Sequence, residues 1–312
     1  MSFSQRSILI IKFGALGDFA LALGAMQAIR HHHQQDRLIL LTTKPFEELA
    51  RQSQWFDEIW TMNRPRQWNL WAWWRLARRI HAWGIDRIYD LQRSKGTERL
   101  FFFLPYPKPE WNGIARGCSH PHRDPQQHDI HTRERHQSQL AETGIKPISE
   151  VDLSWVKADI ARFRIPHPYA ALVPGASRQR SSKRWPVLHY ADLAEFIGRH
   201  KITPVILGSG DEAAIAQIIC QKVPQAISLV NQTSFPDIVA LARQAQFAVG
   251  NDTGPMHLIA PTGCPSLTLF GPDSRPGLTE PRGAKAQILA AADLNKLDVA
   301  MVVAKLREMT SF

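Results

Sequence analysis

Residues 250–257 read Gly-Asn-Asp-Thr-Gly-Pro-Met-His, and this stretch predicts a strand that turns sharply into a helix. An apolar run, 247–249, precedes it, and Pro255 suits the first helical position because its missing N–H would have no partner there. Gly254 is then the expected N-cap. The backbone N–H groups from Met256 onward would point out of the helix and form a seat for a phosphate or a polyol. Asp-Thr-Gly-Pro is also ordinary turn-and-cap chemistry, so the rest of the chain has to decide between these two interpretations.

The composition is that of a soluble globular protein with room for two domains. The chain has 312 residues, of which 44% are hydrophobic and 21% charged, and a domain takes about 150 residues. A net charge of +10 favours an anionic partner, such as a nucleotide, a phosphorylated lipid, a membrane surface or nucleic acid. The three cysteines are far apart and in no metal-ligand spacing, which indicates reduced thiols in a cytoplasmic protein. We expect neither a signal peptide nor a membrane-spanning segment.

Strands and helices alternate along the chain in two series, which predicts parallel sheets covered by helices on both faces. The predicted strands are 7–12, 37–42, 57–61, 86–92, 169–173, 204–207, 226–230, 247–249 and 266–270, and the predicted helices are 18–31, 44–53, 67–83, 188–200, 212–220, 235–245 and about 298–308. We therefore expect two open α/β domains, 1–160 and 161–312, with the last helix free to pack back on the first. The Gly-rich breaks follow strand ends, where such sheets bind ligands, so the site is expected in a cleft between the domains.

The first strand-to-helix turn, Gly14-Ala15-Leu16-Gly17-Asp18, carries two glycines and a carboxylate. Its spacing is not that of the dinucleotide-binding fingerprint. Asp18 could cap the helix that follows, a role worth about 1 kcal/mol. A carboxylate at the mouth of a glycine-lined cleft could equally act as a general base.

Two further turns of the second domain carry charges. The loop 177–186 has four cations before its helix, at Arg178, Arg180, Lys183 and Arg184. Because it leaves the carboxyl end of a strand, a diphosphate clamp is favoured over a merely solvated loop. The acidic pair 211–212 begins a helix after Gly-Ser-Gly and could cap it or bind ribose hydroxyls.

Histidine and arginine crowd the segment 117–135 and the residues around it. The arginines would oppose a metal ion, so we favour a loop that grips an anionic acceptor over a zinc site. Three basic residues after another strand end could extend the same patch: Arg93, Lys95 and Arg99.

The long helix 67–83 has a buried stripe with Trp73 and an opposite face with Trp71, Arg75 and Arg78. Tryptophan beside arginine on an exposed face suits the headgroup level of an anionic membrane. The alternative is that Trp71 is buried against a loop.

Together these motifs resemble glycosyltransferase family 9, the ADP-heptose:lipopolysaccharide heptosyltransferases, over nearly the whole chain. The matching segments are 14–18, 90–92 with the basic residues that follow it, 174–176, 183–186, 250–257 and 270–272. The resemblance implies a GT-B fold, in which two Rossmann-like domains face each other across a cleft. It also implies inverting transfer of heptose from ADP-heptose to the inner core of lipopolysaccharide. One departure is the segment 273–276, Asp-Ser-Arg-Pro, where the family usually has Thr-Asp-Pro.

The resemblance also implies residue roles. Asp18 would be the general base, and Lys183 would neutralise the leaving diphosphate, so that no metal and no cofactor besides the donor is expected. The implied donor-binding residues are Gly17, Ser177, Lys183, Asp211 or Glu212 at the ribose, Thr233 beside the adenine, Asp252, Thr253, Gly254 and His257. The expected acceptor-binding residues are Arg93, Lys95, Arg116, His120 and Arg123.

The expected partners are ADP-heptose or a related nucleotide sugar, an anionic lipopolysaccharide-core acceptor, and the cytoplasmic face of the inner membrane through peripheral contact. Three alternatives stay open: a transferase for another nucleotide sugar, a non-catalytic nucleotide-sugar-binding protein, and an epimerase, which would consume the donor without an acceptor. A nucleic-acid binder is disfavoured, because the basic residues cluster at strand ends and not along one helix.

Overall fold

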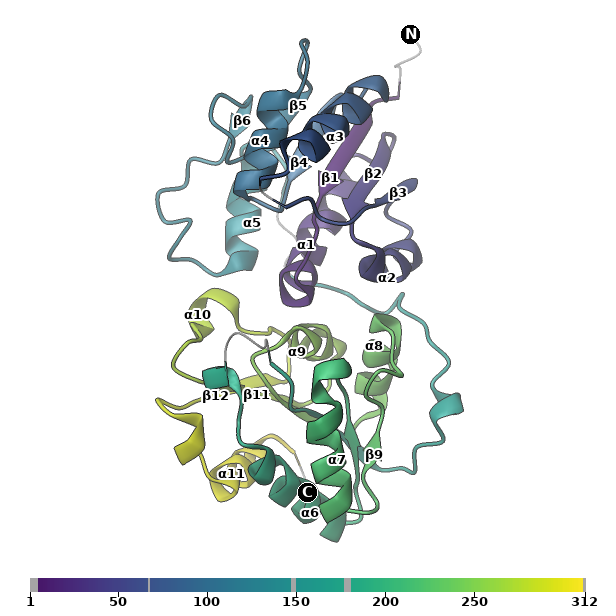
Figure 1. Ribbon diagram of the computed structural model, residues 1–312, viewed down its shortest axis with the longest axis vertical. Helices are drawn as coiled ribbons and strands as arrows, with labels where there is room; N and C mark the ends of the chain where they lie inside the picture. Colours follow the sequence, from purple (N-terminus) through teal and green to yellow (C-terminus); the bar gives the residue numbers. More distant parts are fainter. Residues whose placement is uncertain (1–4, 67, 147–149, 177–180, 311–312) are drawn as a thin grey trace. The chain divides into compact units, whose positions relative to one another are not determined.

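The computed structural model describes residues 5–66, 68–146, 150–176 and 181–310, without the side chains of Ser181 and Asp211. The chain divides into two compact units, Met1–Val151 and Asp152–Phe312. Each unit has a parallel six-stranded sheet with helices packed on it (Figure 1). The second unit begins before position 161, where the sequence predicts the start of the second domain.

In the first unit the sheet has the order β3-β2-β1-β4-β5-β6. The strands are β1 (Ser7–Ile11), β2 (Arg37–Thr42), β3 (Glu58–Thr61), β4 (Arg87–Asp90), β5 (Glu110–Gly113) and β6 (His120–Pro121). The helices are α1 (Leu16–His32), α2 (Glu47–Gln52), α3 (Leu70–Ala82), α4 (Lys95–Phe103) and α5 (Thr132–Ala141).

The central strands of this sheet are buried apolar runs, as expected for parallel strands covered on both faces. Leu9 and Ile11 face a cluster formed by α3, α4 and the neighbouring strands, in which Trp73 of α3 and Trp111 of β5 are fully buried. The alternate side chains of the strand point to the other face, where α1 and α5 pack together.

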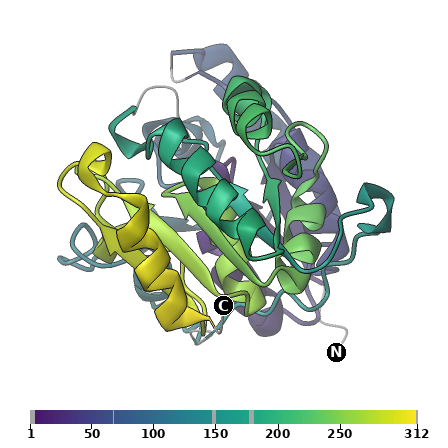
Figure 2. The ribbon, with the colours of Figure 1, turned by 90° about the horizontal axis from the view of Figure 1, so that it is seen from below.

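In the second unit the order is β12-β11-β10-β7-β8-β9. The strands are β7 (Tyr169–Val173), β8 (Thr203–Ile206), β9 (Ile227–Ser228), β10 (Phe247–Asn251), β11 (Ser266–Phe270) and β12 (Ala286–Ala290). The helices are α6 (Val187–Arg199), α7 (Ala213–Lys222), α8 (Phe235–Gln244), α9 (Gly254–Ile259), α10 (Pro276–Thr279) and α11 (Val299–Met309). The last helix, α11, packs beside α6 within this unit (Figure 2).

Both sheets reverse their strand order at one point. In the first unit the chain builds outward from β1 to β3 and then returns to place β4 on the other side of β1. In the second unit β10 returns to the free side of β7 in the same way. The loops that leave the two strands at such a switch point diverge, and the crevice outside their carboxyl ends is where open α/β sheets bind ligands.

Two helices that carry predicted site residues begin one or two residues before the predicted position. Helix α1 begins at Leu16, before Asp18. Helix α9 has Thr253 as its N-cap, one residue before the predicted cap, and Pro255 lies in its first turn. The N–H of Met256 donates to the Thr253 carbonyl (3.1 Å), so it does not point outward as predicted.

Four elements in the later part of the first unit were not predicted, and they are α4, β5, β6 and α5. Segment 117–135 is not one loop, because it contains β6 and the first turn of α5. Helix α3 begins at Leu70, capped by Asn69, and not at position 67, which lies outside the described residues.

Candidate functional site

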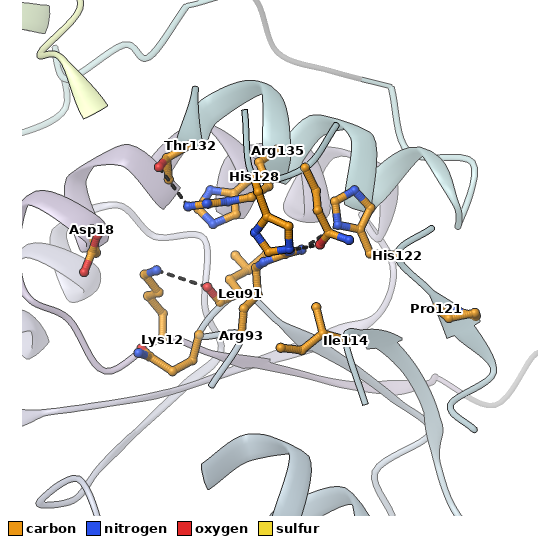
Figure 3. A pocket seen from close by; sticks show the side chains of 13 residues that line it. Lys12, Asp18, Leu91, Arg93, Ile114, Pro121, His122, His128, Thr132 and Arg135 are labelled. Carbon is orange, nitrogen blue, oxygen red and sulfur yellow. Dashed lines mark hydrogen bonds between the residues drawn. The ribbon is translucent and has the colours of Figure 1, made fainter. Parts of the chain in front are cut away.

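A cavity of about 450 Å³ lies at the switch point of the first unit (Figure 3). Its walls come from the loops after β1, β4 and β5, from the first turn of α1, from the segment around β6, and from α5. The lining residues are Lys12, Asp18, Leu91, Gln92, Arg93, Ile114, Pro121, His122, Gln127, His128, Thr132, Arg135 and His136. Three cations against one carboxylate make this lining basic, which suits an anionic group.

Asp18 lines this cavity with an exposed side chain. It lies in the first turn of α1, whose N-cap is Ala15, and no side chain caps that end. Within the described part of the chain, no hydrogen bond or ion pair holds the Asp18 carboxylate. The alternative that Asp18 caps the helix is therefore wrong. The carboxylate is sterically available to accept a proton from a bound hydroxyl.

Lys12 is the residue directly after β1, and it is buried beside Asp18 (Figure 3). Its Nζ donates to the Leu91 carbonyl oxygen (3.0 Å). Burial lowers the pKa of the Lys12 ammonium to about 8, although the Asp18 and Asp90 carboxylates act in the opposite direction. Burial also lowers the pKa of Arg135, and the Asp18 charge acts in the opposite direction. Asp18 is thus within electrostatic reach of two cavity cations.

Arg93 lines the other side of the cavity, and its guanidinium is held by hydrogen bonds to uncharged side chains. Its guanidinium donates to His122 Nδ1 (2.7 Å), Gln139 Oε1 (2.8 Å) and Gln127 Oε1 (2.5 Å). Burial, together with the Arg93 charge, lowers the pKa of His122 to about 4, so the ring is neutral near pH 7 and Nδ1 can accept. Its Nε2 then donates to Ser138 Oγ (2.8 Å). Because these partners are uncharged, the positive charge of Arg93 remains to attract an anion.

Asp90 ends β4 under this cavity and is fully buried. Its Oδ1 accepts from the N–H groups of Gln92 (3.1 Å) and Arg93 (3.0 Å), which holds Arg93 in the left-handed backbone region (φ 51°). Burial raises the pKa of Asp90 from 3.8 to about 6, although these hydrogen bonds and the Arg93 charge oppose it. A buried carboxyl that retains its proton links folding to pH.

We expect Asp90→Asn to change the pH dependence of stability. Between pH 4 and 6 folded Asp90 holds a proton that the unfolded chain has released, so the wild type loses stability as pH rises, by about 3 kcal/mol over the window. Asparagine keeps the Oδ1 acceptor but does not titrate. Urea unfolding at a series of pH values should show the wild type losing stability relative to Asp90→Asn across this window. Parallel curves for the two proteins would contradict the raised pKa.

Lys183 and Asp252 form a buried ion pair at the switch point of the second unit. Lys183 Nζ lies 2.5 Å from Asp252 Oδ2, and the two side chains are 11% and 6% exposed. The same oxygen accepts from Ser274 Oγ (2.8 Å), and His257 Nε2 lies 4.0 Å from the other oxygen. The structure therefore brings together three residues that the sequence predicts at the donor. It adds Ser274, which is not among the predicted site residues.

The Asn251 carboxamide holds the loops that position this pair. Its Oδ1 accepts from the Trp185 N–H (3.1 Å) and the Tyr190 hydroxyl (3.1 Å), and its Nδ2 donates to the Pro174 carbonyl (2.7 Å). All four residues are buried. One side chain at the end of β10 thus fixes the loop after β7, which carries Lys183.

Glu212 also lies among these strand ends, and it caps a short helix. Its Oε2 accepts from the N–H (2.7 Å) and the hydroxyl (3.0 Å) of Ser209. Gly175 leaves room for this carboxylate, because a Cβ there would lie 2.6 Å from Glu212 Oε1 unless the glutamate side chain moved. The capping function is confirmed, and the ribose role stays a prediction. The side chain of Asp211 and the whole of Ser177 lie outside the described residues.

The remaining predicted donor residues lie at helix starts. Gly17 is in the first turn of α1, Gly254 opens α9, and Thr233 directly precedes Ser234, the N-cap of α8. Their contacts with a nucleotide sugar stay predictions.

Of the predicted acceptor residues, Arg93 lines the cavity of the first unit. The other four lie outside its lining, and they are Lys95, Arg116, His120 and Arg123. The cavity instead uses Lys12, which is predicted only as the last residue of the strand 7–12 and not as a site residue. A lysine directly after a buried strand, just before the Gly-rich turn, is the signal that could have identified it.

The histidines near the cavity have separate roles. His122 bonds Arg93, His131 Nδ1 accepts from the Arg133 N–H at the start of α5 (3.2 Å), and His136 is buried with a pKa well below its ordinary value because of desolvation. In the described ranges no group of three or more His, Cys, Asp or Glu side chains is placed to hold a metal ion. Nor do those ranges contain a helix with the length and apolar character needed to cross a membrane.

Comparisons with known proteins agree with the predicted family. A lipooligosaccharide heptosyltransferase 2 from Haemophilus influenzae is 32% identical over 127 residues, which make up 39% of this chain and 36% of that protein. The chain spans about a third to a half of the length of the curated heptosyltransferases that it matches.

Two solved structures resemble the whole chain. A glycosyl transferase family 9 protein from Veillonella parvula has a TM-score of 0.83 at 17% identity, with 99% of this chain and 98% of that chain covered. ADP-heptose lipopolysaccharide heptosyltransferase II from Escherichia coli has a TM-score of 0.79 at 20% identity, covering 97% and 98%. These likenesses confirm the predicted GT-B class, with two Rossmann-like domains in tandem. Since the family model for glycosyltransferase family 9 (heptosyltransferase) matches residues 73–303, well over half of the sequence, the chain belongs to this family.

Proposed function

We propose that this protein is an inverting glycosyltransferase that moves heptose from ADP-heptose to the inner core of lipopolysaccharide on the cytoplasmic side of the inner membrane. The observation that carries the proposal is the exposed Asp18 carboxylate in a basic cavity at the switch point of the first unit. Membership of family 9 and the heptosyltransferases among its relatives support the choice of sugar.

In this proposal the first unit binds the acceptor. Lys12, Arg93 and Arg135 attract its anionic groups, and Asp18 takes the proton of the attacking hydroxyl. The hydroxyl oxygen then forms a bond to the anomeric carbon of the donor as the bond to the diphosphate oxygen breaks. Attack from the face opposite the leaving group inverts the anomeric configuration.

The second unit binds the donor. Lys183 would meet the negative charge that grows on the leaving diphosphate, because an ammonium has three N–H donors and Asp252 takes one of them. This positive charge is the basis for proposing a reaction without a metal ion. Glu212 and Thr233 are proposed beside the nucleoside, and His257 supports Asp252 from the first turn of α9.

A thermal-shift screen with nucleotides and nucleotide sugars tests the donor proposal. We expect ADP and ADP-heptose to raise Tm by several degrees and UDP or GDP sugars to have little effect. A ligand at about 100 times its Kd adds roughly 2.7 kcal/mol to the free energy of unfolding. Selective stabilisation by a UDP or GDP sugar would contradict the choice of donor. Loss of the donor in the absence of any acceptor would indicate an epimerase.

A further inference from the structure

The segment 59–85, which includes α3, has an unusual charge and aromatic content. It contains no Asp or Glu, although both flanking positions, Glu58 and Asp86, are acidic. Six of the ten tryptophans of the chain lie in it, at Trp60, Trp68, Trp71, Trp73, Trp74 and Trp83, together with five arginines, Arg64, Arg66, Arg75, Arg78 and Arg79. Such a segment is strongly cationic and amphipathic, and neither property is explained by the proposed transfer reaction.

Only one face of α3 belongs to the core. Trp73, Leu76, Ala77 and Ile80 are buried, and the Trp73 indole packs so closely on Gly96 of α4 that a Cβ there would collide with it. This face holds the helix on the sheet and explains why the helix forms here.

The opposite face carries large apolar side chains that the fold does not bury. Trp71 is 62% exposed, Trp74 46% and Leu70 52%, and Trp68, just before the helix, is 73% exposed. The alternative that Trp71 is buried against a loop is therefore wrong. Exposed tryptophans so close together are unusual on a surface that contacts only water.

Arginines lie among these indoles without acidic partners. The Arg75 guanidinium lies over the Trp71 ring, 4.7 Å from its centroid, and Arg66 lies over Trp68 at 5.4 Å. Arg78 is also exposed on this face. Throughout the described residues, no ion pair involves an arginine of segment 59–85. The charge of this face is therefore not balanced locally.

We propose that Trp68, Leu70, Trp71, Trp74, Arg75 and Arg78, here called the Trp–Arg face, dock the protein on an anionic lipid bilayer. Indole rings favour the depth of the headgroups, and arginine is attracted to anionic lipids. Helix α3 has 13 residues and is about 20 Å long, so it would lie in the plane of the interface and not cross it. The positive charge of this face attracts an anionic lipid surface. The same face of a second copy of this chain would also be positive and would repel it, so charge complementarity favours the lipid surface.

Vesicle co-sedimentation with the 312-residue chain tests this proposal and does not depend on the transfer reaction. We expect binding to vesicles of phosphatidylcholine with phosphatidylglycerol, weakening with added salt, and much weaker binding to phosphatidylcholine alone. The double variant Trp71→Ala/Trp74→Ala should lower the partition coefficient by roughly tenfold or more, with Tm unchanged because both side chains are exposed. Arg75→Gln/Arg78→Gln should lower binding to the anionic vesicles and reduce its dependence on salt.

Matched control variants come from α6 of the second unit. Leu188→Ala removes an apolar side chain that is 64% exposed, and Arg199→Gln removes an exposed cation. Both should bind vesicles like the wild type. The proposal is overturned if the wild type does not prefer anionic vesicles, or if the tryptophan variant binds as tightly as the wild type. It is also overturned if the wild type ignores vesicles but forms a dimer that the tryptophan variant cannot form.

Discussion

Asp18→Asn is expected to lower kcat by about 10²-fold or more while leaving the donor affinity within a few-fold, as removal of a general base should. The carboxylate is the proposed proton acceptor for the attacking hydroxyl, and an amide of the same shape cannot take that proton. Rates of ADP release with a lipopolysaccharide-core acceptor give kcat, and calorimetry with ADP gives the affinity.

This variant is informative because the Asp18 side chain contributes little to the stability of the fold. Its side chain is exposed, and the helix end is not capped by it. The loss of one negative charge near a helix N-terminus costs only about 0.3–1 kcal/mol. A large fall in kcat with an almost unchanged Tm would therefore report chemistry and not misfolding.

Glu48→Gln is the matched control. Glu48 is an exposed acidic residue in the first turn of α2, in the same unit, and it does not line the cavity. Its replacement removes the same charge from an equivalent position in a helix and should leave kcat unchanged. Normal turnover in Asp18→Asn would remove Asp18 from the mechanism. An equal fall in both variants would point to a general effect of net charge.

Most of the fold follows from the sequence because its signals are local. Buried parallel strands such as Tyr169–Val173 read as continuous apolar runs, and all nine predicted strands occur in the sheets. The strands missed in the first unit, β5 and β6, are short and polar, with sequences Glu-Trp-Asn-Gly and His-Pro. They are formed by pairing with β4 and with each other, which no local pattern records.

Site residues could be predicted only where a charged or polar residue lies in the segment that follows a predicted strand. Asp252 directly follows the end of β10, and Lys183 lies in the loop after β7. The structure pairs them across 69 positions. Ser274 lies in the segment where the sequence departs from the family pattern, yet its hydroxyl reaches Asp252. Lys12 carries a local signal, because it lies directly after a buried strand. Its contact with the Leu91 carbonyl could not be predicted from that signal, because Leu91 follows β4, far along the chain.

Lys183→Ala is expected to weaken ADP binding and to lower turnover, each by about tenfold or more. A charged hydrogen bond to a buried group contributes about 1.5–3 kcal/mol, which corresponds to that range. If the ammonium contacts the diphosphate in both the bound donor and the departing ADP, then ADP affinity by calorimetry and kcat should fall together. Unchanged ADP affinity would argue against a diphosphate clamp.

The variant also removes the partner of a buried carboxylate, so its effect on folding has to be separated. Breaking a buried ion pair on one side costs about 3–5 kcal/mol, because the remaining charge is left uncompensated. Asp252 would keep only the Ser274 hydroxyl as a hydrogen-bond donor among the contacts described above. We therefore expect Lys183→Ala to lower Tm as well as affinity.

The double variant Lys183→Ala/Asp252→Asn distinguishes the two effects. Neutralising Asp252 removes the uncompensated charge and should restore much of the lost Tm. If Lys183 acts on the diphosphate, the double variant still binds ADP weakly and turns over slowly despite its restored stability. If Lys183 serves only to neutralise Asp252, affinity returns with Tm. Lys222→Ala is the control, since Lys222 pairs with Asp192 and Glu195 on the surface of the same unit and its loss should change neither property.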